Sequence, residues 1–339
     1  MGLIRVGAIG YGYWGPNLVR NFVENPSSEV VMVADLNKER LTKIKALYPR
    51  IMVTEDYKDL FTQNLDAVII ATPPPTHYPL AKECLEHGLH VLVEKPITLK
   101  SQHAEELINI SKKKELVLMV GHTFEYNAAV HTLKLLVESG ELGQIYYVDA
   151  ARLNLGLFQR ELNVLWDLAP HDISILLYIL NRTPISVSAH GMPFVNEGIQ
   201  DVVYMNMVFP DNILAHIHVS WLDPCKVRRV TVVGSKKMVV YNDVESLEKI
   251  RIYDKGVDKP TYTDTFGDFQ LSYRYGDVII PNIRLTEPLQ KECQHFLDCI
   301  NNHTIPQSSG QDGLHVVKII EAAQRALNQN GKHQEVIKW

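Results

Sequence analysis

The spacing of apolar and polar residues divides the chain into two parts with different patterns. Up to residue 121, short runs rich in Val and Ile alternate with segments whose apolar residues recur at helical spacing. Nearly continuous β-branched runs that alternate with helices are typical of a parallel sheet with both faces covered. The pattern therefore predicts a doubly wound α/β domain over residues 1–121. The apolar runs are RVGAIG, EVVMVAD, RIMVT, AVIIAT, HVLVEK and LVLMVGH, and the helical segments are residues 16–23, 38–47, 76–87 and 101–113.

From residue 122 onward the strands become longer and loops replace most of the helices between them. Consecutive strands joined only by loops favour an antiparallel sheet with one covered face, so a second, α+β domain is predicted over residues 122–339. The polar, turn-rich segment 255–269 is predicted to be a surface loop. The predicted strands are residues 144–155, 185–190, 202–208, 214–220, 227–233 and 238–241, and further helices are predicted near residues 128–138, 287–301 and 311–328.

Composition and charge narrow the class of protein. Of the 339 residues, 46% are hydrophobic and 22% are charged, and the net charge is −5, which is ordinary for a globular protein. No Lys/Arg run suggests nucleic acid or an anionic membrane, and no apolar run reaches the roughly 18 residues of a membrane helix. The 4 cysteines form no C-x-x-C pair, which favours reduced thiols, and no export signal is visible. We therefore expect a cytoplasmic protein.

A glycine-rich turn follows the first predicted strand. Gly10, Gly12 and Gly15 have the G-x-G-x-x-G spacing, and Pro16 stands where a helix would begin. In this motif the first glycine allows the tight turn, the second lets the backbone approach a pyrophosphate, and the third lets helix and strand pack closely. The positive helix end then faces the phosphates. The turn is predicted to bind a dinucleotide, with Tyr13 and Trp14 of the same turn among the contacts. The alternative is a glycine-rich turn of another α/β protein.

An acidic residue ends the second predicted strand. Asp35 lies about 20 residues beyond the last glycine, which is the spacing expected for a residue that binds the adenosine ribose. Its carboxylate would accept hydrogen bonds from the ribose hydroxyls and repel a 2′-phosphate, so NAD is favoured over NADP. Lys38 and Arg40 lie close by in the sequence and would soften that preference.

The ends of the next two predicted parallel strands carry further candidates, because ligands bind beyond the carboxyl ends of such strands. Thr72, Pro73 and His77 follow the fourth strand and form either a stiff loop or a wall against the cofactor. Glu94 and Lys95 follow the fifth. They are either a solvated ion pair or cofactor contacts, with the lysine ammonium placed to hydrogen-bond a substrate hydroxyl.

These motifs together resemble one family of enzymes. GYGYWG, the EKP after the fifth strand, and an Asp-x-x-x-His in WDLAPHDISIL resemble the glucose-fructose oxidoreductase / inositol dehydrogenase / rhizopine-catabolism (Gfo/Idh/MocA) family over essentially the whole chain. The resemblance implies a Rossmann domain, then an α+β domain with a large open, mostly antiparallel sheet. It also implies NAD as cofactor and a homodimer or homotetramer formed through that sheet. YGYWGPNLVRNF and HTFEYNAAV look most like nucleotide-sugar dehydrogenases, although Ala128 replaces a proline that many relatives carry.

The resemblance implies the catalytic residues Lys95, Asp167 and His171. Asp167 and His171 are four residues apart, so a helix that begins near Asp167 puts both on one face, with Pro170 in its first turn. His171 is expected to act as general base, Lys95 to hydrogen-bond the same substrate oxygen, and Asp167 to adjust the histidine. Trp166 is expected to line the substrate site. The alternative is that Asp167 is only a helix N-cap and His171 a satisfied histidine in the first turn of the helix.

Four more residues are weaker candidates for the substrate or cofactor. Tyr126 follows the sixth predicted strand and is a candidate for the substrate, and Asn127 beside it is a candidate for the cofactor. Arg152 and Asn154 share one face of a strand and either bind the substrate or give that face its polarity. His216-Ile-His218 has no evident third ligand, so no metal is expected.

Three functions remain open on the sequence alone. The leading one is oxidation of the 3-hydroxyl of a UDP-N-acetylhexosamine to a 3-keto sugar. The second is the same chemistry on inositol or a free sugar, or the reduction of a 3-keto sugar. The third is a non-enzymatic NAD-binding regulator, against which the intact Lys95, Asp167 and His171 argue.

Overall fold

The computed structural model describes residues 2–258 and 272–336. It divides into two compact units, each of which takes in residues from two parts of the chain. The first comprises residues 1–126 and 286–318, and the second comprises residues 127–285 and 319–339. No helix in the part of the chain that the structure describes is long and apolar enough to cross a membrane.

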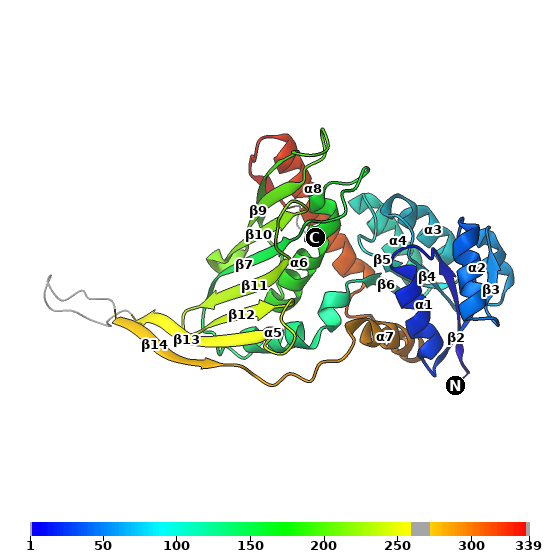
Figure 1. The fold of residues 1–339 in the computed structure, drawn as a ribbon, viewed down its shortest axis with the longest axis horizontal. Helices are drawn as coiled ribbons and strands as arrows, with labels where there is room; N and C mark the ends of the chain where they lie inside the picture. The colour runs from blue at the N-terminus through cyan, green and yellow to red at the C-terminus, as the bar shows by residue number, and fades with distance from the viewer. Residues whose placement is uncertain (1, 259–271, 337–339) are drawn as a thin grey trace, which may run out of the picture. The chain divides into compact units, whose positions relative to one another are not determined.

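The first unit contains a parallel sheet with strand order β3-β2-β1-β4-β5-β6 (Figure 1). This order reverses direction between β1 and β4, which is the switch point where open α/β sheets bind ligands. The strands are β1 (Ile4–Ile9), β2 (Ser28–Ala34), β3 (Met52–Thr54), β4 (Ala67–Ile70), β5 (His90–Glu94) and β6 (Leu118–Gly121). The helices are α1 (Gly15–Glu24), α2 (Lys38–Leu47), α3 (His77–Glu86) and α4 (Ser101–Lys113), with 3-10 turns η1 (Tyr57–Thr62), η2 (Pro74–Thr76) and η3 (Thr123–Tyr126).

A helix from near the end of the chain completes this unit. Helix α7 (Pro288–Asn302) packs against α1, and Phe296 meets Phe22 edge-on with ring centroids 6.2 Å apart. Both rings are fully buried in the same core as the strands β1 and β2. Residues 286–318 therefore supply part of the hydrophobic core of the first unit.

The second unit contains, in its described residues, a sheet of 9 strands with order β14-β13-β12-β11-β7-β10-β9-β8-β15. The pair β7 and β10 is parallel, and the other neighbours are antiparallel. The strands are β7 (Ile145–Leu153), β8 (Ser186–Met192), β9 (Val202–Val208), β10 (Leu214–Ser220), β11 (Val227–Gly234), β12 (Met238–Asn242), β13 (Ile250–Asp258), β14 (Ser272–Ile279) and β15 (Gln334–Glu335). The predicted fold class, a Rossmann domain followed by an α+β domain with a mostly antiparallel sheet, is confirmed.

Helices cover one face of this second sheet. Helix α5 (Ala128–Glu138) packs on α6 (Val164–Leu180), and α6 contacts β7, β9 and β10. A 3-10 turn, η4 (Pro210–Asn212), joins β9 and β10, and α8 (Gly310–Asn328) runs from residues of the first unit into residues of the second. On the other face, Tyr147, Val208 and Leu214 lie in one row across three adjacent strands. They are 45%, 38% and 48% exposed, so this sheet face keeps apolar side chains in solvent.

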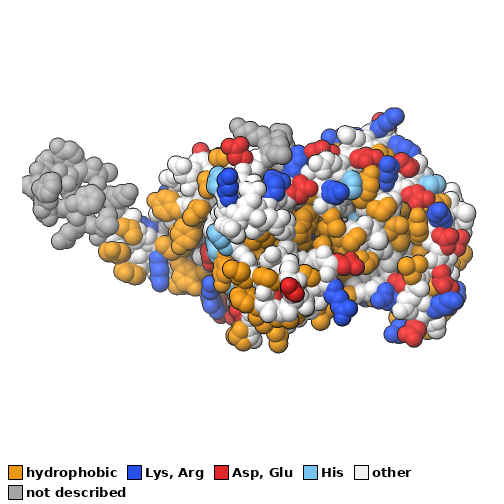
Figure 2. Space-filling view, turned by 90° about the horizontal axis from the view of Figure 1, so that it is seen from above, with side chains coloured by type: hydrophobic (Ala, Val, Ile, Leu, Met, Phe, Trp, Pro, Cys, Tyr) orange, Lys and Arg blue, Asp and Glu red, His pale blue; other side chains and the backbone are white. Residues whose placement is uncertain are grey.

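Two expectations about the second unit need correction. Residues 255–258 of the predicted surface loop extend β13, and residues 259–269 lie outside the described residues. Strand β14, with the sequence SYRYGDVI, pairs with β13 and is not among the predicted strands, because Gly276 and Asp277 interrupt its short alternation. Most side chains of β14 are exposed on both faces of the sheet, so no buried face imposes an apolar pattern on the strand. Several of these exposed side chains are nevertheless apolar, and apolar side chains gather at this end of the second unit (Figure 2).

Candidate active site

The glycine turn between β1 and α1 has the geometry that its spacing predicts. Gly10 has φ +95°, and a Cβ there would lie 2.6 Å from the Ala71 carbonyl oxygen. A Cβ on Gly15 would collide with the Gly10 carbonyl, whereas one on Gly12 would lie 3.7 Å from the Arg40 guanidinium, with no closer atom among the described residues beyond its two neighbours. The turn is therefore closed on its strand side and open where a pyrophosphate would approach, which fits a dinucleotide.

Asp35 lies just beyond β2 and closes the far end of the turn. Its Oδ2 accepts a hydrogen bond from the Tyr11 N–H at 2.6 Å, and its Oδ1 accepts one from the Asn37 N–H at 2.8 Å. Arg40 Nη1 lies 3.5 Å from Oδ1 and 3.4 Å from Oδ2. The carboxylate is buried and held rigidly beside the glycine turn. Tyr13, another residue of the turn that is predicted to contact the cofactor, is 88% exposed.

His77 joins the loops that follow β4 and β5. Its Nε2 lies 2.8 Å from the Thr72 carbonyl oxygen and its Nδ1 lies 2.7 Å from the Pro96 carbonyl oxygen. Burial lowers the pKa of His77, although both carbonyls act in the opposite direction. The Thr76 hydroxyl donates a hydrogen bond to the Thr72 hydroxyl at 2.6 Å. Pro73 lies in the same loop, directly before the 3-10 turn η2. The ring therefore fixes both loops, while direct cofactor contacts of Thr72, Pro73 and His77 stay predictions.

Glu94 ends β5 and has a carboxylate enclosed by protein. Its Oε2 accepts a hydrogen bond from the Lys95 N–H at 3.2 Å, and the Trp14 indole donates another to the carboxylate. Gly121 leaves the space that this carboxylate fills, because a Cβ there would lie 2.9 Å from Glu94 Oε1. Burial raises the pKa of Glu94 to about 7, against the opposing effect of the Lys95 charge. Trp14 and Glu94 thus contact each other beside Lys95.

The structure adds a second carboxyl to this region that the sequence did not single out. Glu292 on α7 is fully buried, and the Thr123 hydroxyl donates to its Oε2 at 2.7 Å. Burial first, and then the charge of Glu94, raise the pKa of Glu292 well above its usual range. A signal was present: Glu292 stands between Leu289 and Phe296 on the apolar stripe of its helix.

His122 directly follows β6 and is also buried. Both of its ring nitrogens lack a hydrogen-bond partner among the described residues. Burial, assisted by the positive charge of Lys95, lowers the pKa of His122 to about 3, so the ring is neutral. Glu94 and His122 therefore lie close enough to the candidate catalytic lysine to respond to its charge, and Glu292 lies close to Glu94.

Helix α6 carries the candidate residues of the second unit, and it begins earlier than expected. Asn163 is the N-cap and its Oδ1 accepts the Trp166 N–H at 3.3 Å, so Asp167 is not the cap. Pro170 lies inside the helix rather than in its first turn, and its ring removes the bond to the Trp166 carbonyl. Asp167 instead accepts a hydrogen bond at 2.9 Å from the buried Trp221 Nε1. The capping alternative for Asp167 is therefore wrong.

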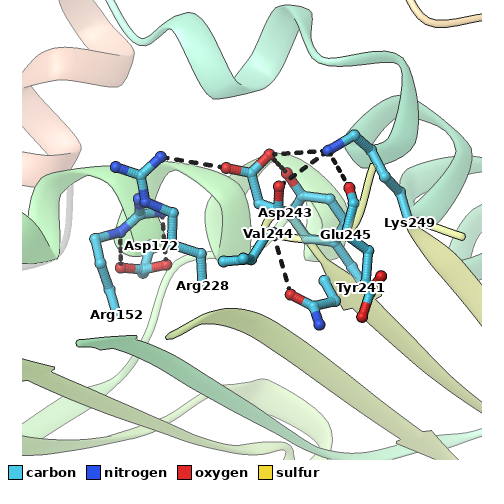
Figure 3. Close-up of polar contacts among 9 residues, drawn as sticks. Arg152, Asp172, Arg228, Tyr241, Asp243, Val244, Glu245 and Lys249 are labelled. Carbon is cyan, nitrogen blue, oxygen red and sulfur yellow. Dashed lines mark hydrogen bonds and ion pairs between the residues drawn. The ribbon is translucent and has the colours of Figure 1, made fainter. Parts of the chain in front are cut away.

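Arg152 and Asp172 fix α6 to the sheet beside His171. Arg152 Nε and Nη2 donate to the two carboxylate oxygens of Asp172 at 2.7 and 3.0 Å, and both side chains are buried (Figure 3). This bidentate pair holds the backbone of the residue next to His171. Two of the Arg152 donors are directed at Asp172 rather than at a ligand. Substrate binding by Arg152 therefore stays a prediction.

More charges continue this network on β11, β12 and the following loop. Asp243 accepts a hydrogen bond from the Tyr241 hydroxyl at 3.0 Å and one from Arg228 Nη1 at 3.3 Å. Lys249 Nζ donates to the Asp243 carbonyl oxygen at 2.9 Å (Figure 3). Each carboxylate in the network therefore has a cation as its neighbour.

Three predicted contacts have structural roles in the described residues. The Tyr126 hydroxyl lies 3.0 Å from Ser308 Oγ, and burial raises its pKa. Asn127 caps α5 by accepting the Ala129 N–H at 2.9 Å. The Asn154 N–H donates to the Ser220 carbonyl oxygen at 3.2 Å. Roles for Tyr126, Asn127 and Asn154 toward ligands stay predictions.

Comparison with known proteins identifies both halves of the chain. Residues 4–122 match the family model described as oxidoreductase family, NAD-binding Rossmann fold, and residues 130–240 match the GFO/IDH/MocA C-terminal domain. The chain is 31% identical over 264 residues to the uncharacterized oxidoreductase YdgJ of Escherichia coli, covering 73% of each.

Two further relatives have named activities. The UDP-N-acetylglucosamine 3-dehydrogenase of Acidithiobacillus ferrooxidans is 27% identical over 260 residues, which cover 75% of this chain and 78% of the relative. Its solved structure shares the fold, with a TM-score of 0.80 at 24% identity over 97% of this chain and 99% of that one. The myo-inositol 2-dehydrogenase of Thermotoga maritima is 25% identical over 356 residues, covering 98% of this chain and 100% of the relative.

Proposed function

Because this chain belongs to the Gfo/Idh/MocA family of NAD-binding oxidoreductases, we propose that it oxidises the 3-hydroxyl of a UDP-N-acetylhexosamine to a 3-keto sugar. The chain is an oxidoreductase, and relatives act on sugar and inositol hydroxyls. The structural observation that carries the proposal is the anchoring of Asp167 by Trp221, four residues before His171 on the same helix. The relative that acts on UDP-N-acetylglucosamine supports the substrate.

In the proposed reaction the protein supplies a base, a hydrogen-bond donor and a fixed helix. NAD, when bound, supplies the nicotinamide ring that accepts the hydride. His171 takes the proton of the sugar hydroxyl, and Lys95 donates a hydrogen bond to a substrate oxygen as negative charge develops there. Asp167 orients the histidine, and the Asp172–Arg152 pair keeps α6 from moving during the reaction. Trp166 lines the sugar site in this proposal.

Substitution of the two catalytic candidates tests the mechanism. Lys95→Ala and His171→Ala are each expected to lower kcat by about 10²–10⁴-fold, because the first removes the donor that stabilises the substrate oxygen and the second removes the base. NADH binding, measured by fluorescence titration, should change little. The matched controls are Lys100→Ala and His333→Ala, two exposed side chains of the same types, which should leave both values unchanged. Near-normal turnover in either catalytic variant would remove that residue from the mechanism.

A substrate panel separates the two candidate reactions. The purified chain with NAD is mixed with UDP-N-acetylglucosamine or with myo-inositol, and NADH is followed by its absorbance in the presence of a carbonyl trap. Turnover of the UDP-sugar alone supports the proposal. Turnover of myo-inositol alone supports the second candidate, which is favoured by the 25% identity over nearly the whole chain to an inositol dehydrogenase.

We also propose that the chain forms a homodimer or homotetramer through the exposed face of its nine-stranded sheet, counted in the described residues. Apolar and aromatic surface is left in solvent on this face by the row Tyr147, Leu214 and Val208. Tyr204 is also exposed on this face and stacks on His218, with ring centroids 4.1 Å apart. Leu214→Glu would place a charge in that row. Sedimentation should show dissociation of this variant, and an unchanged mass would contradict the proposal.

A further inference from the structure

The exposed face of the nine-stranded sheet, counted in the described residues, has polar rows beside its apolar row. The strand register places Asp149, His216 and Asn206 in one row across β7, β10 and β9. The next row contains His218 on β10 and Tyr204 on β9. Because β7 and β10 lie near the middle of the strand order (Figure 1), the two imidazoles lie near the centre of the face proposed above for self-association.

One tyrosine ring holds the two histidines in place. Tyr204 stacks on His218 with ring centroids 4.1 Å apart and an interplanar angle of 19°, and on His216 with centroids 6.1 Å apart. His216 Nδ1 also lies 2.9 Å from Asn206 Oδ1. Both imidazoles are half-buried within this chain, so each has a defined orientation and keeps part of its surface for a second copy to cover.

The surroundings of His218 favour its neutral form. Burial first, and then the charge of His216, lower the pKa of His218, whereas Asp223 and Asp149 act in the opposite direction. His190, two strands away on β8, is a further titratable group in the same row. A second copy that covers this face removes more water from the rings. Because loss of water disfavours the charged form of an imidazole, association favours the neutral rings further.

Charges of opposite sign flank the histidines on this face. Asp149 lies beside His216 in register on β7. Arg229 lies in the row of His218, on β11, with Ala151 of β7 between them. An association through a two-fold axis brings the same patch of two copies together, so the acid and the base of one copy can meet the base and the acid of the other. This charge complementarity favours a second copy of the chain as the partner.

On the basis of the proposed self-association through this face, we propose that the assembly is pH-sensitive and requires neutral His216 and His218 in its interface. Protonation places a positive charge on each ring, and a two-fold axis gathers the rings of both copies in a region that water has left. The separate chains bind these protons more readily than the assembly does. Association is therefore at full strength above the usual pKa range of histidine and weakens as pH falls below about 6.5.

Sedimentation of the full chain at two pH values tests this proposal without substrate or cofactor. The dissociation constant of the wild-type assembly should rise by about tenfold or more between about pH 7.5 and about pH 5.5. His216→Gln/His218→Gln carries no titratable ring at these positions, so its constant should change by less than about threefold over the same range. Circular dichroism at both pH values establishes whether the dissociated chains remain folded.

A matched control separates the histidines of this face from other titratable groups. His87→Gln removes an exposed histidine of the first unit and should keep the wild-type pH dependence. The proposal is overturned if the wild-type constant is equal at both pH values, if the double variant keeps the pH dependence, or if the dissociated chains are unfolded. A wild type that is monomeric at both pH values would contradict the proposed self-association as well, so the two failures are distinguishable.

Discussion

Each unit of this protein contains a cluster of charged side chains that is buried at least in part, and the two clusters are built in opposite ways. In the second unit, Asp172 is paired with Arg152, and Asp243 lies beside Arg228 and Lys249. In the first unit, Glu94 and Glu292 are two neighbouring carboxyls, and the negative charge of Glu94 disfavours ionisation of Glu292. The Oε1 atom of each is buried without a hydrogen-bond partner among the residues described.

The paired cluster fixes the position of a helix, whereas the like-charged cluster changes the pKa values of its carboxyls. In the paired cluster, cations offset the cost of burying carboxylates, and the result is a fixed helix beside His171. The like-charged cluster keeps its protons up to much higher pH, with the pKa of Glu94 raised to about 7 by burial. Shifted pKa values of this kind concentrate at functional sites, and this cluster adjoins Lys95. Four substitutions test this difference between the two clusters.

The largest effect is expected from breaking the paired cluster. Arg152→Met leaves the Asp172 carboxylate buried without its bidentate partner, which should cost about 3–5 kcal/mol of stability. The measurement is the midpoint of urea denaturation, followed by circular dichroism. The double variant Arg152→Met/Asp172→Leu removes both charges and should recover most of the loss. A single variant as stable as the wild type would show that the pair does not hold α6.

The like-charged cluster should respond in the opposite direction. A carboxyl whose pKa is raised on folding adds stability below its unfolded pKa, and this stability is lost as pH rises through the folded pKa. For Glu94 that window runs from 4.5 to about 7. The pKa of Glu292 is raised in the same direction, so Glu292→Gln removes a carboxyl that is ionised at pH 8 in the unfolded chain but whose ionisation is disfavoured when folded. The variant should therefore be stabilised by on the order of 1–3 kcal/mol at pH 8 and little at pH 4. Thermal denaturation at both pH values checks this, and equal destabilisation at both would contradict the like-charge description.

A neutral donor provides an intermediate case. Trp221→Phe removes the 2.9 Å hydrogen bond to Asp167 and also leaves a small cavity where the larger indole was buried, so the expected loss is about 1–3 kcal/mol. If Asp167 positions His171, kcat should fall more than KM rises, and the pH profile of kcat should shift. The control Phe158→Leu alters the ring that packs on Trp221 without touching the hydrogen bond. A stability loss with unchanged kcat would confine Trp221 to a structural role.

The smallest effect is expected at Thr123. Thr123→Val keeps the shape of the side chain and removes the 2.7 Å hydrogen bond to Glu292, so it should cost about 1 kcal/mol. Because that bond lowers the pKa of Glu292, its loss should raise this pKa further. Thr123→Ser is the matched control and should keep the bond. If Thr123→Val lost more stability than Arg152→Met, the like-charged cluster would contribute more to stability than the paired one, contrary to this expectation.

Local patterns predicted much of the fold, whereas contacts between distant segments could not be predicted. The glycine turn and Asp35 were found because their spacing encodes the geometry. The start of α6 was misplaced because Asp167 and Asn163 are both good cap residues and only the tertiary contact with Trp221 decides between them. Arg152 was interpreted as facing solvent or substrate, since nothing local shows that Asp172 is its partner.

Glu292 shows why part of the candidate site lay beyond the sequence. Its carboxyl is near Glu94 only because α7, from a late part of the chain, packs into the first unit. The charge on an apolar helix stripe was a signal that something unusual is buried there, but not which partner it meets. The strand β14 was missed for a different reason: most of its side chains are exposed, and its alternation covers only four residues before Gly276 and Asp277.

The membership of residues 286–318 in the first unit has a consequence for synthesis on the ribosome. When residue 126 has emerged, Phe22 of the nascent chain still lacks Phe296, the ring that will cover it. At roughly 5–20 residues per second, translation from residue 127 to the end of α7 at Asn302 takes on the order of ten seconds or more. Throughout that interval the dinucleotide-binding unit must wait with an apolar helix face uncovered, which makes the growing polypeptide a natural client for chaperones that bind early.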